Sequence, residues 1–447
     1  MTILYVFIVN VALPNIQLDL HASDADLQLV VISYSIAYGI NLLNSARLGD
    51  LYGRRRIFLL GMTVFGFSSL FCSLSSSSWF LISARAIQGL GASLMMPQVY
   101  SSVRLLFDGD DRRRAFAVMG AVQGVAGVAS QTIGGSLIAL DFGSLGSRLI
   151  FLVNLPIAAY AVIVGRWLLP ETKAEAPTKL DVAGALLGAC ALLSLLLPLL
   201  TGREQGWPWW AIGGLILFLP LLGTFTLYEQ RLARLGGAPI IDVSLFRNMK
   251  FSTGVVIGFF FYSAISSFSL SLTVLLQVGL HRTPIQAALI FLPSTVAFFL
   301  GAVTSASAMK RLGRHALSLG MAVFAVGLIT SAMGVFIGDW SLLALSASVT
   351  FQGFGQGVVI PSLLNVVLSV VTSSEAGMAS GAFSVAQTIG SSCGVTIVGL
   401  ILFSTINNVI GSSQEQTYAA SFALATLYNI AAVLLSLILL TIGKKEE

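Results

Sequence analysis

The chain has 447 residues, of which 56% are hydrophobic and only 10% are charged, with a formal net charge of +5. Soluble domains carry about 25% charged residues, so this composition excludes a water-soluble globular protein. Apolar runs of about 20 residues alternate with short polar segments. They predict transmembrane helices, because a helix of that length crosses the bilayer and satisfies its own backbone groups.

The pattern predicts an all-α polytopic membrane protein with fourteen spans, the first of them short. The spans lie near residues 2–18, 27–46, 57–75, 79–101, 114–139, 149–169, 181–201, 208–228, 252–279, 286–308, 316–337, 341–366, 377–405 and 418–442. Residues 2–18 lack a basic leader and a small-residue cleavage site, so we expect no cleaved signal peptide. The three cysteines all fall within predicted spans and far apart, which indicates packing residues. No metal site and no cofactor are expected.

Lys and Arg are unevenly distributed over the predicted loops. Of the 24, twenty fall on one side, three (Arg148, Arg203 and Arg282) on the other, and Arg85 lies inside a span. Positive charge stays cytoplasmic, so both termini are expected inside the cell. The basic residues are dispersed over short loops, which argues against a nucleic-acid partner.

The tract ARLGDLYGRRR, residues 46–56, joins the second and third predicted spans. Gly53 permits a tight turn, and Asp50 at the end of a span pairs readily with cations or with a helix N-terminus. This favours a gate in which Asp50, Arg54 and Arg55 take part. The alternative is a simple orientation anchor, because three arginines at a span end fix topology by themselves.

Arg85 is the only charged residue predicted inside a span, with Gln88 one turn further on as a polar companion. An intramembrane cation is expensive and indicates a functional group. The alternatives are that Arg85 snorkels to the outer interface or bonds carbonyls of the first span.

The two halves of the chain repeat each other. The segment Gln88-Gly-Leu-Gly returns as Gln352-Gly-Phe-Gly at an offset of 264, and the same offset relates Gln123 to Gln387. A two-fold repeat with a path between the halves is typical of secondary transporters. Residues 181–228 have no counterpart and are predicted to be two inserted spans.

Three sets of motifs resemble the major facilitator superfamily. Residues 46–56 are similar to its loop between spans 2 and 3, with Ala46 in place of the usual first glycine, and residues 85–91 are similar to its span-4 motif. Asn10-Val-Ala-Leu-Pro, Phe151-Leu-Val-Asn-Leu-Pro and Leu245-Phe-Arg resemble its fourteen-span drug:proton antiporter branch.

The resemblance implies two six-helix bundles, residues 1–170 and 251–447, separated by two inserted spans and a cytoplasmic connector over 171–250. It also implies that Asp50, Gly53, Arg54 and Arg55 latch the cytoplasmic side of an outward-facing state. Arg85 would take part in proton coupling or in substrate-linked hydration.

The sequence departs from that branch at several positions. Ser130-Gln131 stands where exporters usually carry Gly-Pro, and Tyr5 stands where an acid commonly precedes the Asn-Val-Ala-Leu-Pro run. Asp26 and Asp181 lie at span edges, and no Asp, Glu or His is predicted deep in any span. Relative to the family pattern the chain starts about ten residues late, near the minimum length for a first span.

Polar residues embedded in the predicted spans are the candidates for a substrate cavity, and each is alternatively a hydrogen-bonding contact between helices. They are Asn10, Gln123, Gln131, Tyr262, Gln277, Gln352, Gln356, Asn365 and Gln387.

These features predict a monomeric secondary transporter in the cell membrane that exports drugs or other small hydrophobic compounds by alternating access, with protons as coupling ion. A carrier of neutral or anionic solutes is the alternative, favoured by Arg85 and the missing acids. An intramembrane enzyme or receptor is a remote alternative, since the sequence holds no catalytic motif. A channel fits the two-fold repeat poorly. The protein is therefore not expected to be an enzyme.

Overall fold

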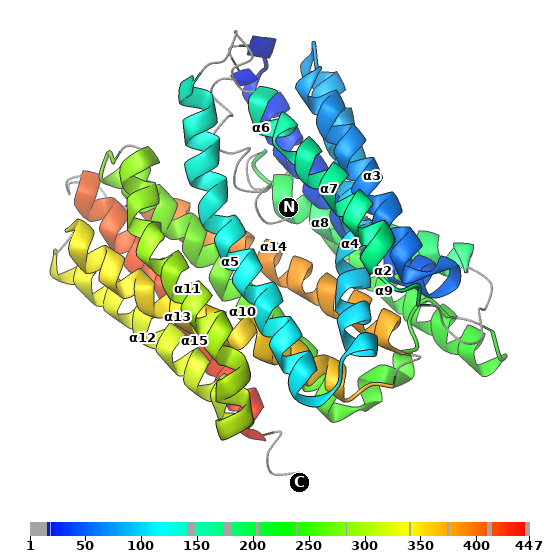
Figure 1. Cartoon of the computed structure of the whole chain (residues 1–447). Coiled ribbons are helices and arrows are strands. Elements are labelled where there is room, and N and C mark those ends of the chain that lie inside the picture. The colour runs from blue at the N-terminus through cyan, green and yellow to red at the C-terminus, as the bar shows by residue number, and fades with distance from the viewer. Residues whose placement is uncertain are drawn as a thin grey trace. The chain divides into compact units, whose positions relative to one another are not determined.

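A computed structural model describes residues 16–17, 19–140, 148–172, 181–202, 205–237, 239–282, 284–338, 341–372, 375–408 and 414–442. The regular elements among them are all helical (Figure 1). They are α2 (Asp24–Tyr52), α3 (Arg54–Ser73), α4 (Ser78–Leu106), α5 (Gly109–Leu140), α6 (Leu149–Leu152), α7 (Asn154–Leu168), α8 (Val182–Thr201), α9 (Trp209–Arg234), η3 (Val243–Arg247), α10 (Met249–Val274), η4 (Leu275–Gly279), α11 (Pro284–Leu312), α12 (His315–Ile337), α13 (Leu342–Ser369), α14 (Ala376–Asn408) and α15 (Gln414–Ile442).

Each predicted span from 27–46 onward coincides with a helix, although the span 149–169 is broken between α6 and α7. Within the described residues, eleven helical segments are long and apolar enough to cross a membrane. The count of fourteen is therefore not confirmed. The 29-residue helix α4 is not among the eleven, and it carries the polar side chains of Arg85 and Gln88. The predicted span 2–18 lies almost entirely outside the described residues.

The chain forms two compact units. The first contains residues 1–106, 129–247 and 371–385, and the second contains residues 107–128, 248–370 and 386–447. In the first unit α4 packs on α2 and α3, α7 packs on α3, and the inserted pair α8 and α9 packs against α2 through α8. In the second unit α13 packs on α11 and α12, and α15 packs on α12 and α10 (Figure 1).

The two units build their central helix pairs in the same way. A Cβ placed at Gly91 of α4 would lie 2.8 Å from the Phe65 nitrogen of α3, and one placed at Gly355 of α13 would lie 2.6 Å from the Phe324 nitrogen of α12. These glycines are related by the offset of 264 found in the sequence. Small residues let helix backbones approach closely in a membrane, so the repeated glycines set the spacing of equivalent helix pairs.

Candidate functional site

The turn between α2 and α3 consists of one residue, Gly53. Its φ is 104°, and its N–H donates to the Gly49 carbonyl at 3.0 Å. Residues with a Cβ rarely adopt this conformation, so the glycine makes the sharp turn possible. The next backbone N–H, of Arg54, donates to the Thr172 carbonyl at 3.0 Å and ties the turn to the segment after α7.

Asp50 in the last turn of α2 and Arg54 in the first turn of α3 form an ion pair, and each side chain is 2% exposed. Arg47, one turn earlier on α2, adds a second positive charge that interacts with Asp50. A buried ion pair loses solvation that its attraction repays only when further groups complete it. Asp50 Oδ2 is buried and accepts no hydrogen bond, so the carboxylate has an unfilled acceptor.

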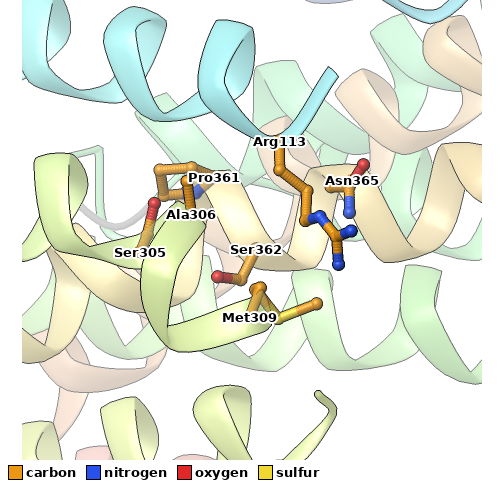
Figure 2. A pocket seen from close by; sticks show the side chains of 7 residues that line it. All are labelled: Arg113, Ser305, Ala306, Met309, Pro361, Ser362 and Asn365. Atoms are coloured by element: carbon orange, nitrogen blue, oxygen red, sulfur yellow. The ribbon is translucent and has the colours of Figure 1, made fainter. Parts of the chain in front are cut away.

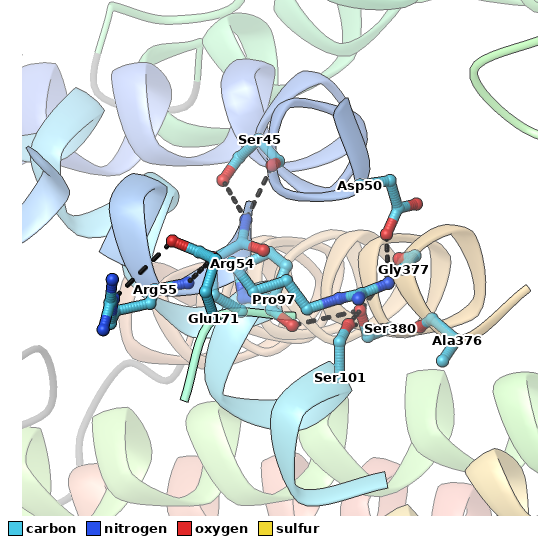
Figure 3. Close-up of polar contacts among 11 residues, drawn as sticks. Ser45, Asp50, Arg54, Arg55, Pro97, Ser101, Glu171, Ala376, Gly377 and Ser380 are labelled. Carbon is cyan, nitrogen blue, oxygen red and sulfur yellow. Dashed lines mark hydrogen bonds and ion pairs between the residues drawn. The ribbon is translucent and has the colours of Figure 1, made fainter. Parts of the chain in front are cut away.

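The Asp50 carboxylate faces the first turn of α14 at Gly377 (Figure 3). A Cβ built at Gly377 would collide with both carboxylate oxygens of Asp50, so only glycine leaves room for this approach. The first turn of a helix carries free backbone N–H groups and the positive end of the helix dipole, which favours a nearby anion. Asp50 is thus placed between cationic side chains and a helix N-terminus.

Contacts between α4 and α14 hold this helix start in place. The Ser101 and Ser380 hydroxyls are hydrogen-bonded at 2.8 Å, and the Ser380 hydroxyl lies 3.3 Å from the Pro97 carbonyl that accepts from it (Figure 3). Arg104 donates to the Val371 carbonyl at 3.0 Å in the segment before α14. These bonds fix the start of α14 beside α4, within the same unit as Asp50.

The sequence grouped Arg55 with Asp50 in the predicted gate, but the partner of Arg55 in the structure is Glu171. Its N–H donates to Glu171 Oε1 at 3.1 Å, its side chain donates to the Leu169 carbonyl at 3.2 Å, and its Nε lies 3.6 Å from Glu171 Oε2. Arg56 also pairs with Glu171, at 3.6 Å. Sequence reasoning missed Glu171, because this contact joins positions 116 residues apart.

Arg85 is 1% exposed and therefore does not snorkel. Its Nε donates to the Val30 carbonyl of α2 at 3.0 Å, another guanidinium nitrogen donates to Gln88 Oε1 at 2.9 Å, and the guanidinium lies 4.6 Å from the centre of the Tyr34 ring. Gln88 in turn donates to Ser69 Oγ of α3 at 2.6 Å. Arg85 thus joins α4 to α2 through a hydrogen bond and a cation–π contact, and its expected partner Gln88 extends the network to α3.

The second unit repeats the glutamine and not the arginine. Gln352 of α13 donates to Ser331 Oγ of α12 at 3.1 Å, the counterpart of the bond from Gln88 to Ser69. The position equivalent to Arg85 is Val349. Gln352 therefore acts as a helix contact, and the buried cation is peculiar to the first unit of the repeat.

The predicted cavity residues differ in their surroundings. Asn10 lies outside the described residues, and Gln131 lies in α5 without a described side chain. Gln123, Tyr262, Gln356 and Gln387 are half-buried, Gln352 and Asn365 are buried, and Gln277 is exposed. Among the members of this set with described side chains, Asn365 lines a small pocket.

Asn365 accepts a hydrogen bond from Arg112 Nε at 3.0 Å. It also lines a small pocket with Arg113, Pro361 and Ser362 (Figure 2). Its cavity volume is about 0 Å³. Sites for drug-sized ligands occupy about 300–1,000 Å³, so this pocket is too small for such a substrate.

The start of α5 is also held by charge. Lys310 of α11 lies 2.9 Å from Asp110. The hydrogen bond from Lys310 and the nearby charge of Arg113 hold the pKa of Asp110 below its ordinary value.

Glu229 lies in a helix, although the sequence placed it at the start of a surface segment. The predicted span ended at residue 228, but α9 continues to Arg234, and Glu229 is 1% exposed. The first residues of the predicted surface segment 229–250 thus belong to this helix. The apolar pattern weakens near the helix end, which is why the boundary was placed too early.

The sequence profile of the Major Facilitator Superfamily matches residues 1–395. A relative named "Probable actinorhodin transporter" from Streptomyces coelicolor is 33% identical over 94% of this chain and 74% of its own length. The tetracenomycin C resistance and export protein of Streptomyces glaucescens is 29% identical over 90% of this chain and 73% of its own length. Among solved structures, the human organic anion transporter MFSD10 aligns with a TM-score of 0.66 at 14% identity, over 98% of both chains.

Proposed function

This chain belongs to the major facilitator superfamily, and we propose that it is a proton-coupled exporter of drugs or other small hydrophobic compounds that works by alternating access. The relatives named for actinorhodin transport and for tetracenomycin C export support the direction of transport and the substrate class. The sequence-predicted resemblance to the fourteen-span drug:proton antiporter branch supports the coupling ion.

The observation that carries this proposal is the position of Asp50. Its carboxylate is buried, paired with Arg54, and directed at the N-terminal turn of α14 at Gly377. A contact of an anion with a helix N-terminus forms or breaks when one helix moves by a small distance, because the dipole effect is confined to the first turn. We assign it as the latch that stabilises one of the two access states.

The proposal includes a membrane arrangement. The loops that carry most of the Lys and Arg residues, including Arg54–Arg56, face the cytoplasm, as do both termini. Residues 1–170 and 251–447 form two six-helix bundles, and residues 171–250 supply the inserted pair α8 and α9 with the connector that follows. The small-molecule substrate passes between the bundles in a monomer that spans the cell membrane fourteen times.

Arg85 supports a second candidate, a carrier of neutral or anionic solutes. A buried cation such as Arg85, which donates hydrogen bonds to Val30 and Gln88, would attract an anion more readily than a cation. The export of drugs remains the first proposal, because the names of the relatives point to antibiotics.

The test uses bacterial cells without their own drug exporters that express the full chain. Wild type is expected to raise resistance to tetracenomycin C or actinorhodin and to speed ethidium efflux. Asp50→Asn removes the anion at the helix N-terminus, worth about 1–2 kcal/mol when partly buried, so efflux should fall about tenfold. Gly377→Ala should slow efflux as well, because its methyl group would displace the Asp50 carboxylate.

Asp111→Asn is the matched control, since this carboxylate is 73% exposed and pairs with its neighbour Arg114 at 3.7 Å. It should behave as wild type at equal membrane abundance. Normal efflux by Asp50→Asn would remove the latch, and no efflux of any compound by an inserted wild type would contradict export.

A further inference from the structure

The inserted helices α8 and α9 carry two acids at one end of the pair, at the start of α8 and near the end of α9. Asp181 is the N-cap of α8, and Glu229 lies five residues before the end of α9. Glu229 is 1% exposed, and the Asp181 Oδ2 atom is buried as well. Neither residue belongs to the motifs of the repeat, because the inserted pair has no counterpart in the other half.

One oxygen of each carboxylate is satisfied. Asp181 Oδ1 accepts from the Gly184 N–H at 3.0 Å and from the Tyr228 hydroxyl at 2.9 Å. Glu229 Oε2 accepts from the Ile241 N–H at 3.2 Å, in the segment that leads from α9 toward α10. Glu229 thus ties this connecting segment to the inserted pair.

The two remaining oxygens, Asp181 Oδ2 and Glu229 Oε1, are buried and have no hydrogen-bond donor. A Cβ built at Gly184 would collide with both of these oxygens. Each oxygen lies 2.3 Å from that Cβ position, so the two oxygens are at most twice that distance apart, over the same small space.

Two ionised carboxylates cannot hold this arrangement at low cost. Like charges in close contact repel, and burial removes the solvation of both. A single proton on one of the two oxygens turns it into a donor for the other and satisfies both at once, as in carboxyl pairs that share a proton. A metal ion is a poorer occupant, since hard cations require six or more oxygen ligands, and the described residues include no group of three or more acidic, His or Cys side chains suited to a metal.

We infer that Asp181 and Glu229 share one proton and form a proton-binding site on the inserted helix pair, used in the coupling of the proposed transport cycle. The coupling role rests on the proposed function, whereas the shared proton rests on the geometry alone. The site supplies the buried acid that the sequence lacks at Tyr5.

The charged groups around the site connect it to the latch. The charge of Arg47 in α2 interacts with both Glu229 and Asp50. When Asp181 and Glu229 lose their shared proton, they attract Arg47 more strongly and so weaken its attraction to Asp50. The other neighbours are the Tyr228 hydroxyl of α9 and, in the connector, Asp242, whose carboxylate accepts from the Ser244 N–H at 2.8 Å. Arg247 of η3 is exposed. Arg47 is therefore the group through which protonation would alter the attraction on Asp50.

Infrared spectroscopy on the full chain in lipid nanodiscs tests the shared proton directly. At about pH 7 free Asp and Glu are ionised, so a protonated carboxyl band at that pH reports an unusual group. We expect the band in wild type and its loss in both Glu229→Gln and Asp181→Asn. Glu415→Gln, which removes an exposed carboxylate at the start of α15, should keep it. Absence of the band in wild type, or its survival in both variants, overturns the inference.

The coupling role is tested by the pH profile of ethidium efflux in the same variants. In Glu229→Gln the stimulation of ethidium efflux by an imposed pH gradient is expected to be at least tenfold smaller than in wild type. The variant should remain inserted in the membrane and monodisperse. A wild-type gradient dependence in both variants overturns the coupling role. If the wild type exports nothing, the proposed function fails, but the infrared band still decides whether the proton is shared. If one variant does not fold, the other decides.

Discussion

Burial of an ionisable side chain is the property shared by the residues proposed to be functional. Asp50, Arg85 and Glu229 are each 1% exposed, and each touches groups on a different helix. A charge removed from water is retained only where hydrogen bonds and opposite charges compensate for lost solvation. Asp50 keeps an oxygen without a donor, so its site is incomplete in this conformation. Incomplete compensation suits groups that change partners.

Arg85 permits a prediction that separates charge from packing. Arg85→Ala should abolish gradient-driven ethidium efflux, because it removes the cation and its bonds to Val30 and Gln88. Arg85→Lys keeps the charge but cannot reproduce the forked hydrogen bonds, so it should restore part of the flux. Efflux rates are compared with thermal stability for each variant.

A packing role makes a different prediction for the same pair. If Arg85 only joins helices, efflux in both variants should follow thermal stability, and Lys should give no rescue beyond its effect on stability. Retained proton-linked efflux in Arg85→Ala would reduce Arg85 to a packing residue.

The site residues predicted from the sequence are those marked by local motifs, and the prediction missed contact residues that lie far away along the chain. Asp50, Gly53 and Arg85 were found because a charge or a glycine stands out within an apolar stretch. Glu171 and Gly377 are unremarkable along the chain, and only folding places them beside Arg55 and Asp50. No local sequence pattern predicts such contacts between residues far apart in the chain.

At the scale of helices, the repeated glycines lead to a prediction on stability. A Cβ at Gly355 would lie 2.6 Å from both the Gly320 carbonyl and the Phe324 nitrogen, which are backbone atoms that cannot turn aside. Gly355→Ala should therefore destabilise the chain by about 1–3 kcal/mol, through separation of α12 and α13. The measurement is the melting temperature of the detergent-purified protein.

Gly223→Ala in α9 is the matched control. A Cβ there meets no heavy atom within 4 Å, and alanine is a better helix former, so stability should stay equal or rise by about 0.5–1 kcal/mol. Equal melting temperatures for wild type and Gly355→Ala would contradict the assigned role of the glycine.

Helix positions could be predicted because hydrophobicity determines them directly. Among the described residues, the expected spans agree with the helices from α2 to α15 to within six residues at either end. The exceptions have local causes. The break between α6 and α7 falls just before Asn154 and Pro156, and proline removes a backbone donor from a helix. The continuation of α9 through Glu229 follows from burial of a polar residue, which hydropathy does not detect.

For the whole molecule, the internal repeat was readable because equivalent helices conserve the residues that set their spacing. Gln88 and Gln352 make equivalent bonds to serines, and Gly91 and Gly355 face equivalent backbone atoms. The number of spans is harder to predict. A helix such as α4 carries polar residues, Arg85 and Gln88, that lower its hydropathy.

Proton-coupled export is tested most directly with everted membrane vesicles that contain the full chain. An acid interior is imposed, and accumulation of ethidium and of tetracenomycin C is followed with and without a protonophore. We predict accumulation that requires the gradient and collapses with the protonophore. Accumulation that ignores the protonophore, or none from a chain shown to be inserted, would contradict the account and favour a carrier of neutral or anionic solutes.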